Sequence, residues 1–188
     1  MSVRKLRPSM TEPERLKPSS FISKHASLIA SRISGPIADI ACGSGRNLLS
    51  VLEQTRRIDC YDIRPDCIDP YILSSCGKRL KRYTTDLLAS HFSLRQDEYS
   101  VIFLVHFYHS VVLTQIVQAI KPGGLLVLET VDSRGGNYLE LPHVGEIFNL
   151  ISPLRIITST ARPTGPNADR QVVKLIAERP KKLRNARR

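Results

Sequence analysis

The stretch from Ile37 to Asn47, IADIACGSGRN, constrains the fold of this chain more than any other part of it. Its first five residues form a short apolar run of the kind that makes a buried parallel strand. Gly43 and Gly45 break this run, and a segment predicted to be helical follows. A strand, a glycine turn and a helix form the first half of a nucleotide-binding α/β unit, in which a ligand approaches bare backbone. Leu48 replaces the third glycine of a dinucleotide fingerprint, so the turn suits a ligand with an amino-acid end better than a pyrophosphate.

This turn resembles the glycine-rich first motif of class I S-adenosylmethionine-dependent methyltransferases. The run ACGSGRN, followed by apolar residues, is most similar to the small tellurite-resistance-type methyltransferases. The resemblance implies an α/β, Rossmann-like fold: a seven-stranded, mostly parallel sheet with helices on both faces and a C-terminal antiparallel hairpin. It also implies S-adenosylmethionine as the cofactor. The residues of this motif assigned to the cofactor are Asp39, Ala41, Gly43, Gly45 and Asn47.

The second predicted strand runs from Arg57 to Asp62. It ends in an acid about twenty residues beyond the glycine turn, where a carboxylate can accept hydrogen bonds from ribose hydroxyls. Asp62 and the following Ile63 are therefore candidate cofactor-binding residues, whereas Asp59 lies in mid-strand and is expected to point elsewhere. The alternative is that Asp62 caps the turn that follows it.

Asp86 and Leu87 follow a short predicted strand that ends at residues 84–85. They resemble the place in the methyltransferase family where an acid meets the adenine amino group, and both are assigned to the cofactor on that ground. An aspartate that caps the turn before residues 87–89 is the alternative interpretation.

The strongest predicted strand, Tyr99–Val105, ends in a polar and aromatic cluster. Because ligands bind at the carboxyl edge of a parallel sheet, Val105 is a candidate for cofactor contact and His106, Tyr108 and His109 are candidates for catalysis. Methyl transfer mainly requires alignment of the acceptor and exclusion of water. A base is needed only if the acceptor must lose a proton, which either histidine could accept near neutral pH. Packing of either histidine beneath the next helix stays an equal alternative.

The same junction argues against two methyltransferase subclasses. Enzymes that methylate exocyclic base amines have an Asn/Asp-Pro-Pro-Tyr/Phe-like sequence here, and the residues VHFY at 105–108 do not resemble it. Pyrimidine C5 chemistry requires a nucleophilic cysteine, and no cysteine follows Cys76.

The C-terminal half completes the predicted sheet. A helix over residues 110–120 ends in a KPGG turn, which precedes a strand over 125–131. The polar loop over 132–138 is the expected place for an acceptor pocket. Strands over 154–159 and 171–178 form the antiparallel hairpin, with which a pure dinucleotide-binding fold would not end.

Residues 20–34 are predicted to form an N-terminal helix that lies against the domain. A segment that covers the cofactor in the resembled family has a similar opening and a similar His-Ala pair. In this chain the corresponding residues are Pro18, Ser19, Phe21, His25 and Ala26.

With 188 residues, the chain is long enough for one domain, predicted over residues 20–178. Its net charge of +11 lies mostly in two segments: a basic, flexible arm over residues 1–19 with +3 and a basic, disordered tail over residues 179–188 with +6. No aromatic residue interleaves with these charges. Solvated tails are therefore favoured over a weak electrostatic contact with nucleic acid.

The four cysteines have no C-x-x-C spacing, so we expect neither a metal site nor a disulfide framework, and the predicted compartment is the cytoplasm. No apolar run approaches the length of a membrane span, and charge and proline stand where a signal peptide would need an apolar core. The expected assembly is a monomer or a homodimer.

Two function classes remain open from the sequence. The first is a methyltransferase that acts on a small-molecule acceptor or a soft anion such as a chalcogen oxyanion. The second is an RNA-associated methyltransferase, or a non-catalytic methyltransferase-like binding module, recruited by the basic tails. Leu48 and the C-terminal hairpin argue against a third class, a nicotinamide dehydrogenase.

Overall fold

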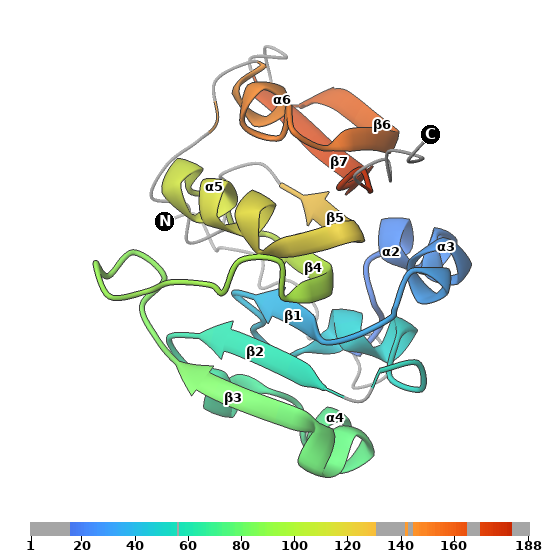
Figure 1. Cartoon of the computed structure of the whole chain (residues 1–188). Coiled ribbons are helices and arrows are strands. Elements are labelled where there is room, and N and C mark those ends of the chain that lie inside the picture. The colour runs from blue at the N-terminus through green and yellow to red at the C-terminus, as the bar shows by residue number, and fades with distance from the viewer. Residues whose placement is uncertain (1–15, 56, 131–141, 143–144, 165–169, 182–188) are drawn as a thin grey trace, which may run out of the picture.

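A computed structural model describes residues 16–55, 57–130, 142, 145–164 and 170–181 of the chain. Most of the predicted arm over 1–19 and tail over 179–188, and the loop over 132–138, lie outside these residues. Within the described part, seven strands form one sheet in the order β3-β2-β1-β4-β5-β7-β6 (Figure 1). The strands are β1 (Ile37–Ile40), β2 (Ile58–Asp62), β3 (Leu80–Thr84), β4 (Tyr99–Val105), β5 (Ile120–Glu129), β6 (Arg155–Thr164) and β7 (Arg170–Glu178).

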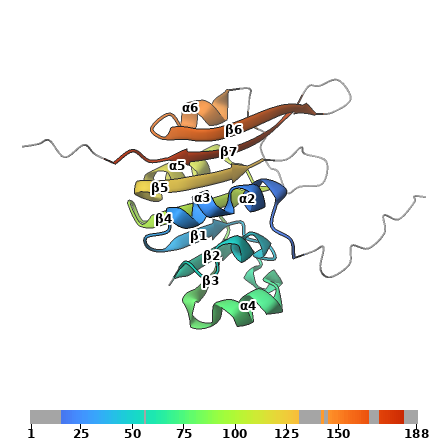
Figure 2. The same ribbon diagram turned by 90° about the vertical axis from the view of Figure 1, so that its right-hand side faces the viewer.

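Strand β7 pairs antiparallel with both β5 and β6, and the other strand pairs are parallel. Figure 2 shows β3 at one edge of the sheet and the β6–β7 hairpin at the other. The predicted seven-stranded, mostly parallel sheet with a C-terminal antiparallel hairpin is thereby confirmed.

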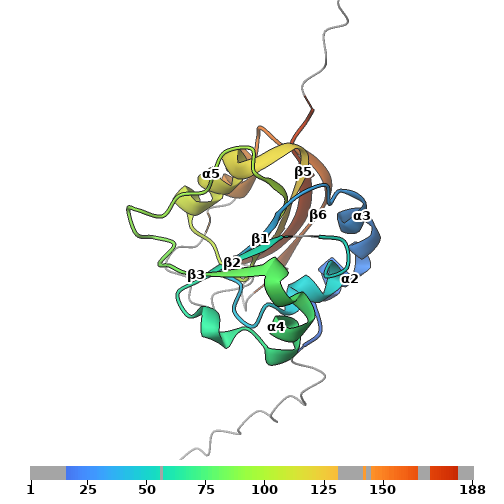
Figure 3. The same ribbon diagram turned by 60° about the horizontal axis from the view of Figure 1, so that its bottom comes forward.

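Helices cover both faces of the sheet, which confirms the other part of the fold prediction (Figure 3). One face packs against α2 (Ser20–Lys24), α3 (Ala26–Ser31), α4 (Pro70–Cys76) and a 3-10 turn, η1 (Arg46–Ser50), and two further 3-10 turns, η2 (Pro65–Cys67) and η3 (Gly77–Arg79), flank α4. The opposite face packs against α5 (Ser110–Ala119) and α6 (Glu146–Leu150). Because successive strand side chains point to opposite faces, Ile37 joins the core under α2 while Ala38 and Ile40 join the core under α5.

The N-terminal segment forms two short helices rather than the single helix predicted over residues 20–34. They meet at His25, whose φ of −107° and ψ of 14° leave the α-helical region. The His25 ring lies 4.6 Å from the Phe21 ring, and its Nδ1 atom lies 2.9 Å from the Phe21 carbonyl oxygen. The break allows Phe21 on the first helix and Ile29 on the second to enter the same core.

Pro70 begins α4 and does not interrupt it. In the structure it occupies the first turn of α4, and the Asp69 side chain caps this helix by accepting a 2.8 Å hydrogen bond from the Tyr71 N–H. Proline suits this position because the N–H it lacks would have no partner within the helix.

The amino ends of the strands are joined by ion pairs and buried hydrogen bonds. Arg57 lies just before β2 and contacts the carboxylates of Asp59 and Glu98, each at 2.7 Å. The Tyr99 hydroxyl donates a 2.9 Å hydrogen bond to Asp59, and the Tyr61 and Tyr99 hydroxyls lie 2.8 Å apart. Asp59 is fully buried in this network, so it points away from the carboxyl edge, as its mid-strand position predicts.

The four cysteines carry free thiols, of which Cys42, Cys60 and Cys76 are buried in the core on the α2 face. Among the described residues, no three or more His, Cys, Asp or Glu side chains come together in a way that could hold a metal ion. No described helix has the length and apolar character that crossing a membrane requires.

Candidate functional site

The carboxyl end of β1 brings together a buried acid and an open glycine turn. Asp39 is 1 % exposed, and its Oδ2 atom has no hydrogen-bond partner in the described part of the chain. Burial, and after it the neighbouring Asp62 carboxylate, raise the pKa of Asp39, and Arg46 opposes this effect. A buried carboxyl oxygen without a partner is costly, so this position favours the binding of a ligand that donates a hydrogen bond.

The two glycines of the turn have different environments. Gly43 has a φ of +52°, and a Cβ atom built on it would meet no heavy atom within 4 Å. Gly45 has a φ of +72°, and a Cβ atom there would meet the Ile68 and Ile72 side chains at 3.4–3.6 Å. Gly43 therefore leaves open space at the turn, whereas Gly45 allows close packing against the segment that contains α4.

Two residues other than glycine adopt the left-handed conformation at the same edge of the sheet. Ala41 follows β1 with a φ of +56°, and His106 follows the adjacent β4 with a φ of +62°. This backbone conformation costs roughly 1–2 kcal/mol for a residue with a Cβ atom, and such strain clusters at ligand sites. Val105, the last residue of β4, is buried in the core on the α2 face.

Asp62 links the glycine turn to the end of β2. Its Oδ2 atom accepts a 2.9 Å hydrogen bond from the Gly43 N–H, and its Oδ1 atom accepts one of the same length from the Arg64 N–H. Asp62 therefore caps the turn that follows β2, which is the alternative interpretation of the sequence. It also contacts the glycine turn through Gly43. A carboxylate has about four acceptor positions, so both bonds leave room for a further donor. Ile63 beside it is 62 % exposed.

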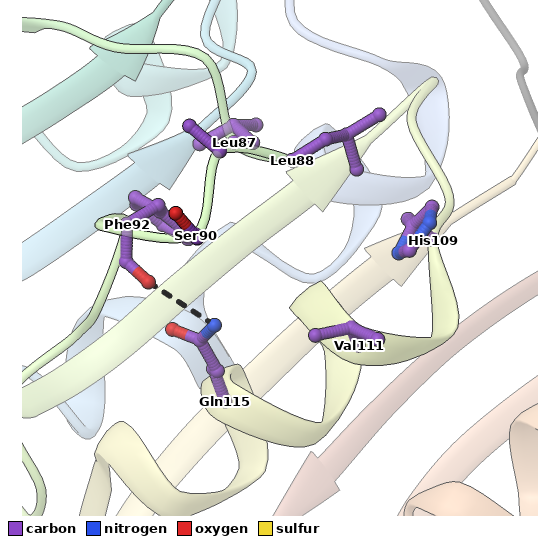
Figure 4. A pocket seen from close by; sticks show the side chains of 8 residues that line it. Leu87, Leu88, Ser90, Phe92, His109, Val111 and Gln115 are labelled. Atoms are coloured by element: carbon purple, nitrogen blue, oxygen red, sulfur yellow. Dashed lines mark hydrogen bonds between the residues drawn. The ribbon is translucent and has the colours of Figure 1, made fainter.

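Asp86 and Leu87 begin the segment that connects β3 to β4. The Asp86 carboxylate accepts a 2.9 Å hydrogen bond from the Leu88 N–H, which corresponds to the capping alternative. A cavity of about 210 Å³ follows directly, between this segment and the start of α5 (Figure 4). Its lining includes Leu87, Leu88, Phe92 and His109.

The structure separates the three residues predicted for catalysis. His106 is solvent-accessible, with 42 % of its side chain exposed, and its Nε2 atom lies 3.7 Å from Glu129 Oε1. Tyr108 is 1 % exposed, and its ring belongs to the core under α5. His109 is the residue before α5 and lines the cavity beside Leu87, apart from the Glu129 side chain.

Glu129, at the end of β5, is a candidate residue that the sequence reasoning did not select. It is 3 % exposed and accepts hydrogen bonds from the Ser19 hydroxyl at 2.6 Å and from the Lys174 ammonium at 2.7 Å. Burial alone would raise its pKa, but nearby His106, Lys174 and Ser19 outweigh burial and lower the pKa of Glu129 to about 2. An acid inside the apolar run LLVLETV was the signal in the sequence.

Ser19 ties the N-terminal helices to this edge of the sheet. Its backbone N–H donates a 3.1 Å hydrogen bond to Asn47 Oδ1 in η1, while its hydroxyl group binds Glu129. The Ser19 hydroxyl also accepts a hydrogen bond from the Ile22 N–H and so caps α2. One residue therefore holds the start of α2 against both the glycine-turn segment and β5.

Solved structures with this architecture were found, although no protein-family model and no curated protein matches the chain. The N-methyltransferase NodS from Bradyrhizobium japonicum WM9, in complex with S-adenosyl-L-homocysteine, aligns with a TM-score of 0.61 at 16% identity over 92% of this chain and 94% of its own. The chain has the class I methyltransferase fold.

Two further structures illustrate what this fold carries in other proteins. The 1,6-didemethyltoxoflavin-N1-methyltransferase from Burkholderia thailandensis, with bound 1,6-didemethyltoxoflavin and S-adenosylhomocysteine, has a TM-score of 0.57 at 15% identity, covering 86% of this chain and 79% of its own. The [4+2]-cyclase SpnF has a TM-score of 0.59 at 13% identity, covering 85% of this chain and 82% of its own. At these identities the likeness concerns the fold, and function has to be argued from the site.

Proposed function

We propose that this protein is an S-adenosylmethionine-dependent methyltransferase that acts on a small-molecule acceptor. The observation that carries the proposal is the pairing of the buried, unpartnered Asp39 oxygen with the open space in front of Gly43. An amino group can donate a hydrogen bond to the Asp39 oxygen, and the open space at Gly43 admits a ligand close to the backbone. The residues present thus fit the amino-acid end of S-adenosylmethionine.

The proposed cofactor residues come from the carboxyl ends of four strands, β1, β2, β3 and β4. Asp39, Ala41 and Gly43 face the amino-acid end, with Gly45 and Asn47 shaping the turn behind them. Asp62 and Ile63 face the ribose, and Asp86, Leu87 and Val105 face the base. Bound S-adenosylmethionine would supply an electrophilic methyl group on a sulfonium. The protein's part is to hold the acceptor in line with that group and to exclude water.

His106 is the residue that we propose for any proton removal from the acceptor. Its support is its place at the end of β4, next to β1, and the exposure of its ring. A soft anionic acceptor would need no base, because it already carries an available electron pair. The run ACGSGRN supports such an acceptor through its similarity to the tellurite-resistance-type enzymes. Tyr108 has no role in this mechanism because its ring is in the core, and His109 would line the cavity near the base.

Calorimetric titration with S-adenosylhomocysteine tests the cofactor site. We expect micromolar affinity, about −8 kcal/mol, and no measurable binding for Gly43→Val. Gly77→Val is the matched control, because Gly77 has a φ of +53° and equally open surroundings but lies beyond α4. Both positions have a positive φ, so valine is strained at either one. Equal binding by the two variants would mean that the cofactor does not lie against Gly43.

Turnover separates a methyltransferase from a binding module or from another reaction on this fold, as in the cyclase. Labelled S-adenosylmethionine is incubated with a panel of small amines, hydroxyl compounds and oxyanions, with RNA as a separate arm. Transfer of label to a small acceptor supports the proposal. Cofactor binding with label transferred only to RNA would favour the RNA-associated alternative.

A further inference from the structure

A groove with three cationic side chains lies beside the candidate site, between α2 and the β6–β7 hairpin. It has a volume of about 280 Å³. The cations come from three elements: Lys24 from α2, Arg162 from β6 and Lys174 from β7. The other described residues of the lining are Ser20, Phe21, Thr160 and Val172, so none of the described lining residues carries a carboxylate. We call these seven residues the cationic groove.

Strand register explains why the cations of the hairpin face the same way. Thr160 pairs with Lys174, and Arg162 pairs with Val172. Side chains two residues apart on a strand share a face, so Arg162 and Lys174 lie diagonally across the hairpin on one face. Like charges in such positions repel each other. A shared face with two cations is thus unfavourable unless a negative group lies near them.

Glu129 supplies one such negative group, but only for Lys174. Its carboxylate is 2.7 Å from the Lys174 ammonium and is buried under α2, where Ser19 binds its other oxygen. Within the described residues, Lys24 and Arg162 form no ion pair with a carboxylate. The cationic groove and Glu129 together therefore carry a net charge of +2.

The position of the groove connects it to the candidate site. Glu129 lies between Lys174 at 2.7 Å and His106 at 3.7 Å, so one side chain separates the groove from the end of β4. Ser19 at the start of α2 contacts both Glu129 and Asn47. A small molecule that places an anionic group in the groove could extend past Glu129 toward the methyl donor proposed above.

We propose that the cationic groove binds an oxyanion, such as a carboxylate or a phosphate, that is part of the methyl acceptor. Lys24 and Arg162 provide positive charges that no described carboxylate pairs with, Lys174 is held in place by Glu129, and the Ser20 and Thr160 hydroxyls are hydrogen-bond donors. The anion-binding part stands on the groove alone. Its assignment to the acceptor rests on the proposed function.

Anion titration at constant ionic strength tests the groove directly. Binding of inorganic phosphate and, in a second arm, of acetate is followed by calorimetry or by amide chemical shifts, with chloride as the balancing salt. Each of Arg162→Gln and Lys24→Gln should weaken the binding of the preferred anion about fivefold or more. Lys81→Gln removes the same charge from exposed strand β3 at the far edge of the sheet and should leave binding unchanged.

The outcomes distinguish this inference from the proposed function. If phosphate and acetate each bind with the same affinity to the wild type and to all three variants, the proposal that the groove binds an oxyanion is wrong. Absence of S-adenosylhomocysteine binding in the wild type would overturn the proposed function but leave the anion result standing. Where an acceptor is found, Arg162→Gln and Lys24→Gln should raise its KM about fivefold with unchanged affinity for S-adenosylhomocysteine. Unchanged KM values in both variants would mean that the groove does not bind the acceptor.

Discussion

The two ends of the parallel strands are built from similar residue types but in opposite ways. At the amino ends, the buried Asp59 carboxylate binds Arg57 and the Tyr99 hydroxyl, and Arg57 also binds Glu98. At the carboxyl ends, Asp39 is equally buried but has one oxygen without a partner among the described residues. Within the described part of the chain, the hydrogen bonds of the Asp62 side chain come from backbone N–H groups.

On this sheet, the acid at the amino ends of the strands therefore contributes to stability, and the acids at the carboxyl ends are available for ligand binding. A buried charge with partners on every side stabilises one packing arrangement, whereas a buried acid with an open acceptor favours the state in which a ligand completes it. Glu129 refines the comparison, because it lies at the carboxyl end yet is satisfied by Ser19 and Lys174. The open edge thus extends over β1, β2 and β4, and a closed, charged boundary begins at β5.

The sharpest test uses two acids three residues apart on β2. Asp59→Ala should lower the free energy of unfolding by about 3–4 kcal/mol, because it leaves Arg57 and the Tyr99 hydroxyl without their buried partner. Asp62→Ala should cost only about 1 kcal/mol of stability, and should weaken S-adenosylhomocysteine binding by about 1.5–3 kcal/mol. Denaturant unfolding and calorimetry on the same samples give both quantities.

Ligand binding by Asp59→Ala is measured without denaturant, at a temperature at which this variant remains folded. The comparison fails if both variants lose ligand affinity equally, or if Asp62→Ala is the less stable of the two. Either result would mean that the two ends of β2 do not divide the roles as described.

The second prediction concerns pH and the closed boundary at Glu129. Its pKa is lowered from 4.5 to about 2 in the folded state, so its contribution to stability is present above pH 4.5 and is lost as the pH falls toward 2. We expect this residue to account for about 2–3 kcal/mol of the acid-induced loss. Glu129→Gln should flatten the unfolding free energy between pH 4.5 and pH 2, relative to wild type.

Glu53→Gln, which removes an exposed carboxyl group at the end of the η1 segment, is the control and should keep the wild-type slope. Identical slopes in Glu129→Gln and wild type would show that Ser19 and Lys174 do not stabilise the ionised carboxylate.

The smallest predicted effect concerns backbone strain at the open edge. Ala41→Gly should stabilise the ligand-free protein by about 0.5–1 kcal/mol, because relief of the left-handed φ outweighs the added freedom of the unfolded chain. Ala38→Gly in the middle of β1 should instead destabilise it by about 1 kcal/mol. Asp97 at the amino edge also has a positive φ, but aspartate tolerates this conformation better than alanine. A loss of stability in Ala41→Gly would contradict stored strain at this edge.

Local sequence patterns predicted much of the fold, but they did not predict the cluster around Glu129. The run YSVIFLV predicted β4 with its observed bounds, because seven buried, mostly branched or aromatic residues admit few other structures. The separation of Asp59 from Asp62 followed from strand position. The Glu129 cluster depends on β7 lying next to β5, a pairing of residues 45 positions apart that no local pattern specifies.

The placement of the histidines was also beyond local reasoning. His106 and His109 are three residues apart, yet the left-handed backbone at His106 turns the chain so that one faces Glu129 and the other lines the cavity beside Leu87. The sequence left open whether each was a functional or a packing residue. It contains no signal for a positive φ at a histidine, because no glycine stands there.

The position of β7 between β5 and β6 has a consequence for the order of folding. The last strand of the sheet to be synthesised fills an interior position, so β5 and β6 have no contact through the sheet until residues 170–178 are available. Until then β5 is an open edge, which is a site for mispairing with other chains. The buried Glu129 also lacks its lysine during this interval. Nascent chains that end before β7 should therefore depend on chaperones. The complete sheet and the cationic groove should form together in one late step.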